Sequence, residues 1–327
     1  MTGFKTAPET ALNWHRTGRR VAIATVVETW GSAPCPAGSQ MIVVDNGSIE
    51  GSVSGGCVEG AVVGEALDAL AVGTPRLLTY GVTGEDAFAV GLACGGTIRI
   101  LVQPVIGLEG NAKGLPVAFL SDLVEKRAAR VPVAIEVDLR TWACRLVVAD
   151  PETIMFPLGN AGIMGDRFVA VHTPPPRLIL VGAVHIAQVL APMAAAAGFE
   201  PIIMDPRSSF ATRDRFPEQR VICDDTEDAI GQTGVDPQTA IVTLGHDPKI
   251  DDPAILEGVA KGAFYIGCLG SRRTHAARLD RLRKAGVADD ALAKIHGPVG
   301  LDIGAEGPAE IAVSILSELV AIRHGKG

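Results

Sequence analysis

The sequence RLILVGAVHIA, residues 177–187, has the pattern of a buried strand that passes through a tight turn into a helix. The apolar segments EPIIMD, RVICDD, AIVTLG and AFYIGCLG follow it as further predicted strands, with helical or polar segments between most of them. Alternation of this kind is typical of a parallel, doubly wound sheet. We therefore predict a Rossmann-like α/β domain over residues 177–327.

The turn after the first of these strands carries part of a dinucleotide-binding fingerprint. Gly182 and Ala187 occupy the first and third positions of G-x-G-x-x-G/A. Asp205 follows at the end of the second strand, where it could bind a ribose or another polyol. Val184 replaces the glycine that lets the backbone approach a pyrophosphate, so NAD(P) binding is disfavoured. Gly182 and Ala187 could instead serve only the packing of strand against helix.

A second candidate ligand site lies at the carboxyl edge of the same predicted sheet. The segment CLGSRRT, residues 268–274, ends a strand with small residues and begins a helix with Arg272 and Arg273. Amide groups at a helix start and two guanidinium groups would bind an anion, although a solvated helix face explains the same residues. Of the histidines near this edge, His185 is favoured to contact a ligand, because it occupies the turn after the first strand.

Residues 1–171 are predicted to form a separate, mixed α+β domain. The three prolines of HTPPPR, which begins at residue 172, exclude helix and central strand, so we place a linker at residues 172–176. Asn46-Gly47 predicts a hairpin with a two-residue turn. The other expected elements are strands at 20–29, 76–81 and 97–105, helices at 57–72 and 115–130, and an antiparallel pair at 131–139 and 144–150. The strands at 76–81 and 97–105 are expected to complete a first βαβ-like half of the domain.

Two cysteines of this domain lie in glycine-rich segments. Cys57 follows Gly55 and Gly56 in SVSGGCVEG, residues 52–60, at the predicted start of a helix. Unpaired amide groups and the helix dipole favour a reactive thiolate at such a position, so we predict that Cys57 handles a ligand. Because Gly55 and Gly56 have no side chains, a bulky cofactor could reach the sulfur and the first amides of the helix together. For Cys94, in ACGG, the sequence favours a packing role and a reactive role equally.

The remaining cysteines give weaker signals. Six cysteines in 327 residues are too few for a disulfide framework, and none are paired at C-x-x-C spacing. Cys144, Cys223 and Cys268 lie within or beside apolar strands and are predicted to be core residues. Cys35 lies between prolines, and the sequence does not decide its role.

The charge and hydropathy of the chain exclude several classes of function. With 29 Lys and Arg against 37 Asp and Glu, the net charge of -8 opposes binding to nucleic acid. No apolar run approaches the ~20 residues of a membrane span, and the N-terminus lacks the apolar core of a secretory signal, so a cytoplasmic protein is expected. No Ser-His-Asp order, H-E-x-x-H cluster or P-loop occurs in the sequence.

Seven segments spread over both domains form a specific combination. They are AIATVVETWGSAPCPAGSQMIV, GSVSGGCVEG, LACGGTIRI, GAVHIAQVLAP, IIMDPR, YIGCLGSRRT and GPVGLDIGAEGPAEIAVSILSEL. Together they make the chain similar to the xanthine dehydrogenase accessory protein family, the XdhC/CoxI type. Members of that family join an N-terminal domain to a Rossmann-like domain and are generally accessory proteins rather than metabolic enzymes.

The resemblance implies a task in the maturation of molybdenum enzymes. Such proteins bind the molybdenum cofactor (molybdopterin), protect it while a cysteine desulfurase replaces an oxo ligand by sulfur, and help to deliver it to a molybdenum hydroxylase such as xanthine dehydrogenase. Carried onto this sequence, the resemblance implies that Cys57, with Cys94 as second candidate, contacts the molybdenum. The phosphate of the pterin, or the pyrophosphate of a nucleotide-extended cofactor, would lie near Gly182, His185 and Arg272. Val184, where the family more often has glycine, favours the form with a single phosphate.

Two other functions compete with this one. The alternative is an NAD(P)-dependent oxidoreductase that uses the Rossmann-like domain and a thiol of the first domain. A purely structural interaction module would use neither thiol. The apolar face of the last helix (Ile311, Ile315, Leu319, Ile322) is compatible with a homodimer, but a buried helix explains it equally well.

Overall fold

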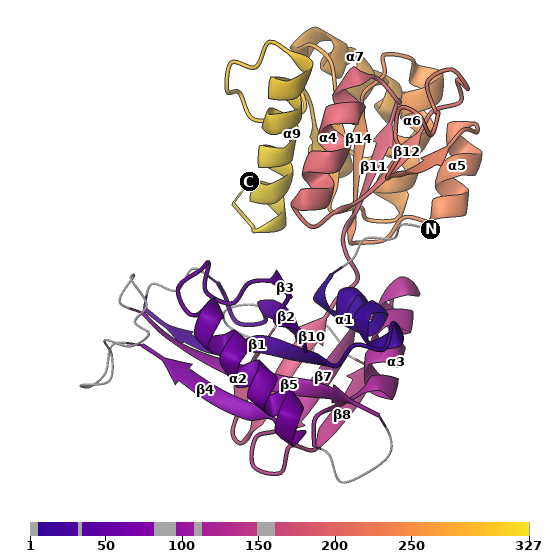
Figure 1. Ribbon diagram of the computed structural model, residues 1–327. Helices are drawn as coiled ribbons and strands as arrows, with labels where there is room; N and C mark the ends of the chain where they lie inside the picture. Colours follow the sequence, from indigo (N-terminus) through magenta and orange to yellow (C-terminus); the bar gives the residue numbers. More distant parts are fainter. Residues whose placement is uncertain (1–5, 32–34, 82–95, 108–112, 149–160, 327) are drawn as a thin grey trace. The chain divides into compact units, whose positions relative to one another are not determined.

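The computed structural model describes residues 6–31, 35–81, 96–107, 113–148 and 161–326, and the chain divides into two units between Pro174 and Pro175 (Figure 1). Strand β10 (Arg167–His172) is the last element of the first unit, and β11 (Arg177–Val181) is the first of the second. No helix within these described ranges is long and apolar enough to cross a membrane.

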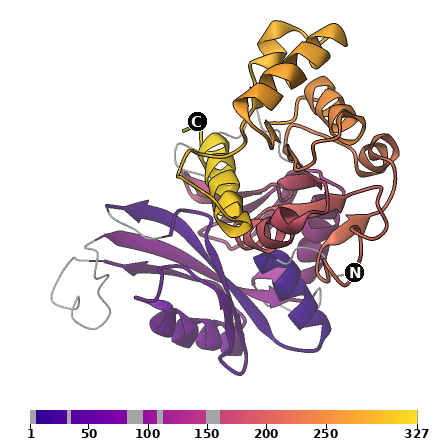
Figure 2. The same ribbon diagram turned by 90° about the horizontal axis from the view of Figure 1, so that it is seen from above.

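An antiparallel sheet with the strand order β3-β2-β1-β5-β4 forms the first half of the N-terminal unit. Alternate residues of β1 point to opposite faces of this sheet. Ala22 and Ala24 pack against helix α2 (Glu59–Val72), whereas Val21 and Ile23 face a second core (Figures 1 and 2). The strands are β1 (Val21–Trp30), β2 (Gln40–Val44), β3 (Ile49–Gly51), β4 (Arg76–Tyr80) and β5 (Thr97–Ile106), and the short β6 (Leu115–Pro116) pairs with β5.

The second core lies between that sheet and a four-stranded antiparallel sheet, β8-β7-β10-β9. Leu12 and Leu120, from the two helices of this layer, and Val133 and Phe168, from the second sheet, are buried in it. The elements are α1 (Ala7–Arg16), α3 (Val117–Ala128), β7 (Val133–Asp138), β8 (Cys144–Val148) and β9 (Ala161–Met164). The mixed α+β character predicted for the N-terminal domain is thus confirmed.

Two local predictions for this unit are wrong. The hairpin between β2 and β3 has a three-residue turn, because Val44 pairs with Ser48 and only Gly47, at φ +81°, takes the left-handed conformation. The predicted βαβ-like half is absent from the described residues, since β5 pairs antiparallel with both β1 and β4.

The second unit contains a six-stranded sheet with the order β13-β12-β11-β14-β15-β16, in which all neighbours are parallel. This confirms the doubly wound Rossmann-like sheet that the alternation of strands and helices predicts. Strands and helices alternate as β11, α4 (His185–Ala196), β12 (Glu200–Met204), β13 (Arg220–Ile222), α5 (Thr226–Thr233), β14 (Thr239–Thr243), α6 (Pro248–Ala260), β15 (Tyr265–Cys268), α7 (Arg272–Lys284), α8 (Asp289–Leu292), β16 (Ile295–His296) and α9 (Pro308–Arg323).

Helices cover both faces of this sheet. Leu178 and Leu180 of β11 pack in the core that contains α4 and α9, while Ile179 and Val181 pack in the core that contains α5 and α6. The apolar face of α9 is accounted for within this unit: Ile315 and Leu319 are buried and belong to the same core as α4. A homodimer remains a prediction.

Candidate functional site

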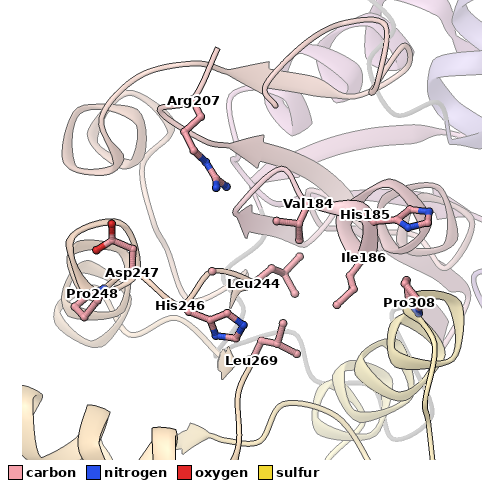
Figure 3. Close-up of a pocket in the computed structure, with 11 residues that line it drawn as sticks. Val184, His185, Ile186, Arg207, Leu244, His246, Asp247, Pro248, Leu269 and Pro308 are labelled. Carbon is pink, nitrogen blue, oxygen red and sulfur yellow. The ribbon is translucent and has the colours of Figure 1, made fainter. Parts of the chain in front are cut away.

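A pocket of about 740 Å³ opens at the carboxyl edge of the parallel sheet, between the ends of β11 and β14 (Figure 3). The strand order reverses at this point, because the chain proceeds from β11 to β13 in one direction and from β14 to β16 in the other. Open α/β sheets usually bind ligands at such a switch point. The walls are formed by residues 184–186 after β11, Arg207 after β12, residues 244–248 after β14, Leu269 after β15 and Pro308 at the start of α9.

Gly182 allows the turns after β11 and β14 to approach each other. Its φ of +106° is a conformation that residues with side chains rarely adopt. A Cβ atom at this position would lie 3.3 Å from the backbone nitrogen of Gly245. The Gly182 amide donates to the carbonyl of Met204 at 2.8 Å, so this glycine ties the β11 turn to β12. The role of Gly182 beside the pocket is therefore to hold the turn in shape, and its contact with a cofactor stays a prediction.

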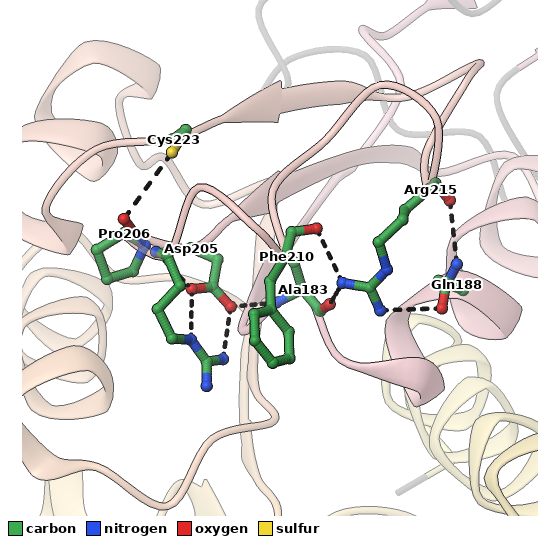
Figure 4. Close-up of polar contacts among 8 residues, drawn as sticks. Ala183, Gln188, Asp205, Pro206, Phe210, Arg215 and Cys223 are labelled. Carbon is green, nitrogen blue, oxygen red and sulfur yellow. Dashed lines mark hydrogen bonds and ion pairs between the residues drawn. The ribbon is translucent and has the colours of Figure 1, made fainter.

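Asp205, predicted to bind a ribose or polyol, is completely buried, and both of its oxygens accept hydrogen bonds from the protein (Figure 4). Oδ1 accepts from the backbone N and from Nε of Arg207, each at 2.9 Å. Oδ2 accepts from Arg207 Nη2 at 2.7 Å and from the Ala183 amide at 2.8 Å. Burial alone would raise the pKa of Asp205, but these hydrogen bonds hold it below the ordinary value. The carboxylate therefore serves to orient Arg207.

Arg207 is held rigidly and extends into the pocket (Figure 3). Asp205 binds one edge of its guanidinium group, and the Phe210 ring lies 4.1 Å from the guanidinium carbon. Arg215 fixes that loop in turn, since its Nη1 donates to the carbonyls of Ala183 at 2.7 Å and Phe210 at 2.9 Å (Figure 4). Asp205 accepts hydrogen bonds from Nε and Nη2 of Arg207, and Asp247, which lines the same pocket, also attracts this guanidinium group.

A buried ion pair lies behind the opposite wall of the pocket. Asp251 and Arg278 are 1% and 2% exposed, with 3.8 Å between Oδ2 and Nη2. Arg278 Nη2 donates to the carbonyl of Leu269 at 3.1 Å, and a Cβ on Gly245 would lie 2.9 Å from Asp251 Oδ1. The pair thus supports two turns that line the pocket. Burial, which outweighs the attraction of Arg278, raises the pKa of Asp251 to about 6.

Of the other residues predicted for this unit, His185 lines the pocket, whereas Arg272 and Arg273 do not. His185 lines it from the start of α4, but its ring is turned away from Arg207 in Figure 3. Arg272 and Arg273 are exposed at the start of α7 and do not belong to the lining residues of this pocket, although Leu269 of the same turn does.

Arg207, the cation that the structure brings into the pocket, was not among the residues predicted from the sequence. The signal was available in DPR, residues 205–207, because an arginine close to the acidic residue of the second strand is where related folds accommodate an extra phosphate. His246 and Asp247 also line the pocket, from the turn after β14.

Cys57 has an exposed side chain and lies next to the first turn of α2, as predicted. The helix begins at Glu59, and Val58 is its N-cap residue. The amides of the two glycines before it are not open to a ligand, because they bind protein oxygens, and access of a cofactor to the first amides of the helix stays a prediction. The Gly55 amide donates to Ser52 Oγ at 2.9 Å, and the Gly56 amide donates to a carboxylate oxygen of Glu59 at 2.9 Å.

The remaining cysteines differ in exposure. Cys268 is buried, as predicted, and burial raises the pKa of its thiol to about 11. Cys223 is exposed, contrary to prediction, because β13 ends at Ile222, and its thiol donates a hydrogen bond to the carbonyl of Pro206 at 3.9 Å (Figure 4). Cys35 and Cys144 are half-buried, and Cys94 lies outside the described residues.

These exposures predict the order in which iodoacetamide modifies the described cysteines of the native protein. Cys57 and Cys223 are expected to react first, and Cys268 only after unfolding, because its thiol is inaccessible. Mass spectrometry of tryptic peptides over a time course measures this order. Modification of Cys268 as fast as Cys57 in folded protein would contradict it.

The chain thus joins an α+β unit with an exposed thiol to a Rossmann-type α/β unit with a pocket at its switch point. Residues 178–319 match the model of the XdhC Rossmann domain, and residues 14–81 match that of the XdhC and CoxI family. The chain belongs to the XdhC/CoxI family.

Named relatives span most of the chain. It is 30% identical over 306 residues to the molybdenum cofactor insertion chaperone PaoD of Escherichia coli, a match that covers 94% of this chain and 84% of PaoD. It is 29% identical to a protein of Bacillus subtilis that is named as a probable xanthine dehydrogenase component, over 92% of each chain. A crystal structure described as a xanthine dehydrogenase from Bacillus halodurans superposes with a TM-score of 0.79 at 25% identity, covering 99% of this chain and 97% of that one.

Proposed function

We propose that this chain is an accessory protein that binds the molybdenum cofactor, assists its sulfuration, and helps to insert it into xanthine dehydrogenase or a related molybdenum hydroxylase. The observation that carries the proposal is the similarity, over 94% of the chain, to a protein named as a molybdenum cofactor insertion chaperone. That similarity spans both units, and each unit offers one feature suited to the cofactor.

The pocket of the second unit suits the phosphate-bearing part of molybdopterin. Its volume of about 740 Å³ is in the range of small-molecule sites. Arg207 extends its guanidinium group into the pocket, and α4 directs its positive amino end toward it. Val184 lines the same wall with a branched side chain where a pyrophosphate would approach the backbone. We infer that a ligand with a single phosphate binds better than a nucleotide-extended form.

In the first unit, the exposed Cys57 thiol is the proposed ligand of the molybdenum, because soft sulfur donors suit such a metal centre. Cys94 stays the second candidate. A cysteine desulfurase would supply the sulfur to the bound cofactor, and the apoprotein of the molybdenum hydroxylase would receive it. A homodimer is part of the same proposal.

The test is the pterin and molybdenum content of protein purified from a host that makes the cofactor. Cys57→Ser and Arg207→Ala are expected to lower that content at least tenfold, because the first removes the sulfur donor and the second the cation of the pocket. Cys223→Ser, which removes an exposed thiol of the second unit, is the matched control and should bind as wild type. Wild-type content in both test variants would refute the proposal.

The oxidoreductase alternative has one observation in its favour. The sheet has the strand order of dinucleotide-binding folds, and Arg207 lies near the end of the second strand, where a 2′-phosphate of NADP would be held. A titration with NADPH followed by nicotinamide fluorescence decides between the two functions. We expect no change in that fluorescence, because Val184 blocks the approach of the pyrophosphate.

A further inference from the structure

The loop that carries Cys57 is built around the carboxylate of Glu59. One oxygen, Oε1, accepts hydrogen bonds from Ser52 Oγ at 2.6 Å and from the amides of Val53 and Ser54 at 3.2 and 2.9 Å. The other oxygen, Oε2, accepts from the Ser54 hydroxyl and from the Gly56 amide at 2.9 Å. Five donors from one short segment therefore converge on a single side chain.

The two serines extend this arrangement to the rest of the loop. Ser52 Oγ also accepts from the Gly55 amide at 2.9 Å, and Ser54 Oγ accepts from the Val58 amide at 3.0 Å. Ser54 is 1% exposed, whereas the Cys57 side chain is exposed. The chain can follow this path because Gly55 and Gly56 have φ values of +72° and +114°. The polar groups of the loop thus point inward to Glu59, and the thiol points outward.

Glu59 is also suited to remain charged in this place. It is the first residue of α2, where a negative side chain interacts favourably with the helix dipole. Burial raises the pKa of its carboxyl, but the hydrogen bonds from Ser52 and Ser54 outweigh burial and lower the pKa to about 2.

We propose that Glu59 is the positioning residue of the Cys57 site: its carboxylate holds residues 52–58 in one shape that presents the thiol. This inference rests on the proposed function of Cys57 and deepens it. Because the amides of Val53, Ser54, Gly55, Gly56 and Val58 are bonded to Glu59 or to the serines, most amides of the loop are already taken, and the group that the loop presents to a ligand is the sulfur atom. The ligand class that fits is a thiophilic metal centre, with its anionic groups bound elsewhere.

The substitution Glu59→Gln tests the role of the charge at constant shape. A glutamine can place its oxygen where Oε1 lies, which preserves the bonds from Ser52, Val53 and Ser54. Its amide nitrogen then faces the Gly56 amide, so two donors meet, whereas the Ser54 hydroxyl can rotate to accept. We expect amide hydrogen exchange at Gly56 to become at least tenfold faster, with Val53 and Ser54 nearly unchanged.

The functional readout is the pterin and molybdenum content of the purified variant. Glu59→Gln is expected to reduce it to the level of Cys57→Ser, while the thermal midpoint of the protein stays within a few degrees of wild type. Glu65→Gln is the matched control, because Glu65 lies on the same helix but pairs with Arg76, away from the loop. Ser52→Ala, which removes two contacts of the loop without changing α2, should give a smaller loss of the same kind.

The outcomes separate this inference from the proposed function. Unchanged exchange at Gly56 in Glu59→Gln overturns the positioning role, whatever the cofactor content. Full cofactor content in Glu59→Gln, when Cys57→Ser has lost it, overturns it as well. If Cys57→Ser keeps its cofactor, the assignment of Cys57 fails, and the exchange data still decide whether Glu59 shapes the loop.

Discussion

Replacement of Asp205 by alanine is expected to lower the free energy of unfolding of the second unit by about 3–4 kcal/mol. The substitution leaves the Ala183 amide without an acceptor in a buried position and removes the acceptor of the Arg207 amide. A buried donor without a partner costs about 1–3 kcal/mol, and the charge-assisted pair with the Arg207 guanidinium is lost as well. Arg207 would then also lose its fixed direction. We therefore expect the variant to bind a phosphate ligand more weakly, in addition to being less stable.

Guanidinium chloride unfolding followed by far-ultraviolet circular dichroism measures this effect. All three tryptophans, Trp14, Trp30 and Trp142, belong to the first unit, so their fluorescence reports separately on the unit that the substitution leaves intact. Asp280→Ala is the control, because Asp280 is 69% exposed in its ion pair with Arg283 and should contribute less than about 1 kcal/mol. A change as small as that control in Asp205→Ala would show that the carboxylate does not organise the β11 turn.

The second large effect concerns Asp251 and pH. Because the folded-state pKa is raised to about 6, Asp251 favours the folded state at low pH, and this contribution is lost as the pH rises through 6. At pH 7.5 the charged carboxylate costs the folded protein on the order of 3 kcal/mol relative to its protonated form. Asp251→Asn imitates the protonated form, so it is expected to stabilise the second unit at pH 7.5 and to change little at pH 4.

Unfolding curves at pH 4, 5, 6, 7 and 7.5 for both proteins test this expectation. The difference in free energy between Asp251→Asn and wild type should grow from near zero to its full value between pH 4 and 7. Asp228→Asn, an exposed position on α5, controls for the loss of one negative charge. A destabilised Asp251→Asn at pH 7.5 would mean that the attraction to Arg278 outweighs burial.

The sheet of the second unit was predictable because the apolar pattern of its strands agrees with their position in a sheet that is covered on both faces. Strands such as RLILV are apolar on both faces, and in the structure Leu178 and Ile179 do face different cores. The pairing of β5 was not predictable in the same way. Strand β5 follows β4, which comes directly after helix α2. A strand after a helix suggests a parallel crossover, but β4 pairs antiparallel with β5, and β5 pairs antiparallel with β1.

The candidate sites were predictable in position but not in the direction of their side chains. Apolar spacing from Val58 onward predicts the helix correctly. The pattern cannot show that the carboxylate of Glu59 accepts hydrogen bonds from the preceding loop and so fixes where that loop ends. Arg207 was missed for a similar reason. Its direction depends on the buried carboxylate of Asp205, and such a contact is fixed only once the strand ends are assembled.

Because Pro308 lines the pocket, the order of translation determines when the pocket can be complete. The turn after β11 is translated more than a hundred residues before Pro308, which contributes to the same pocket from the start of α9. A nascent chain can therefore assemble the central strands and still lack a complete binding cavity. A ligand that needs the wall formed by Pro308 can therefore bind only after the start of the last helix has been translated.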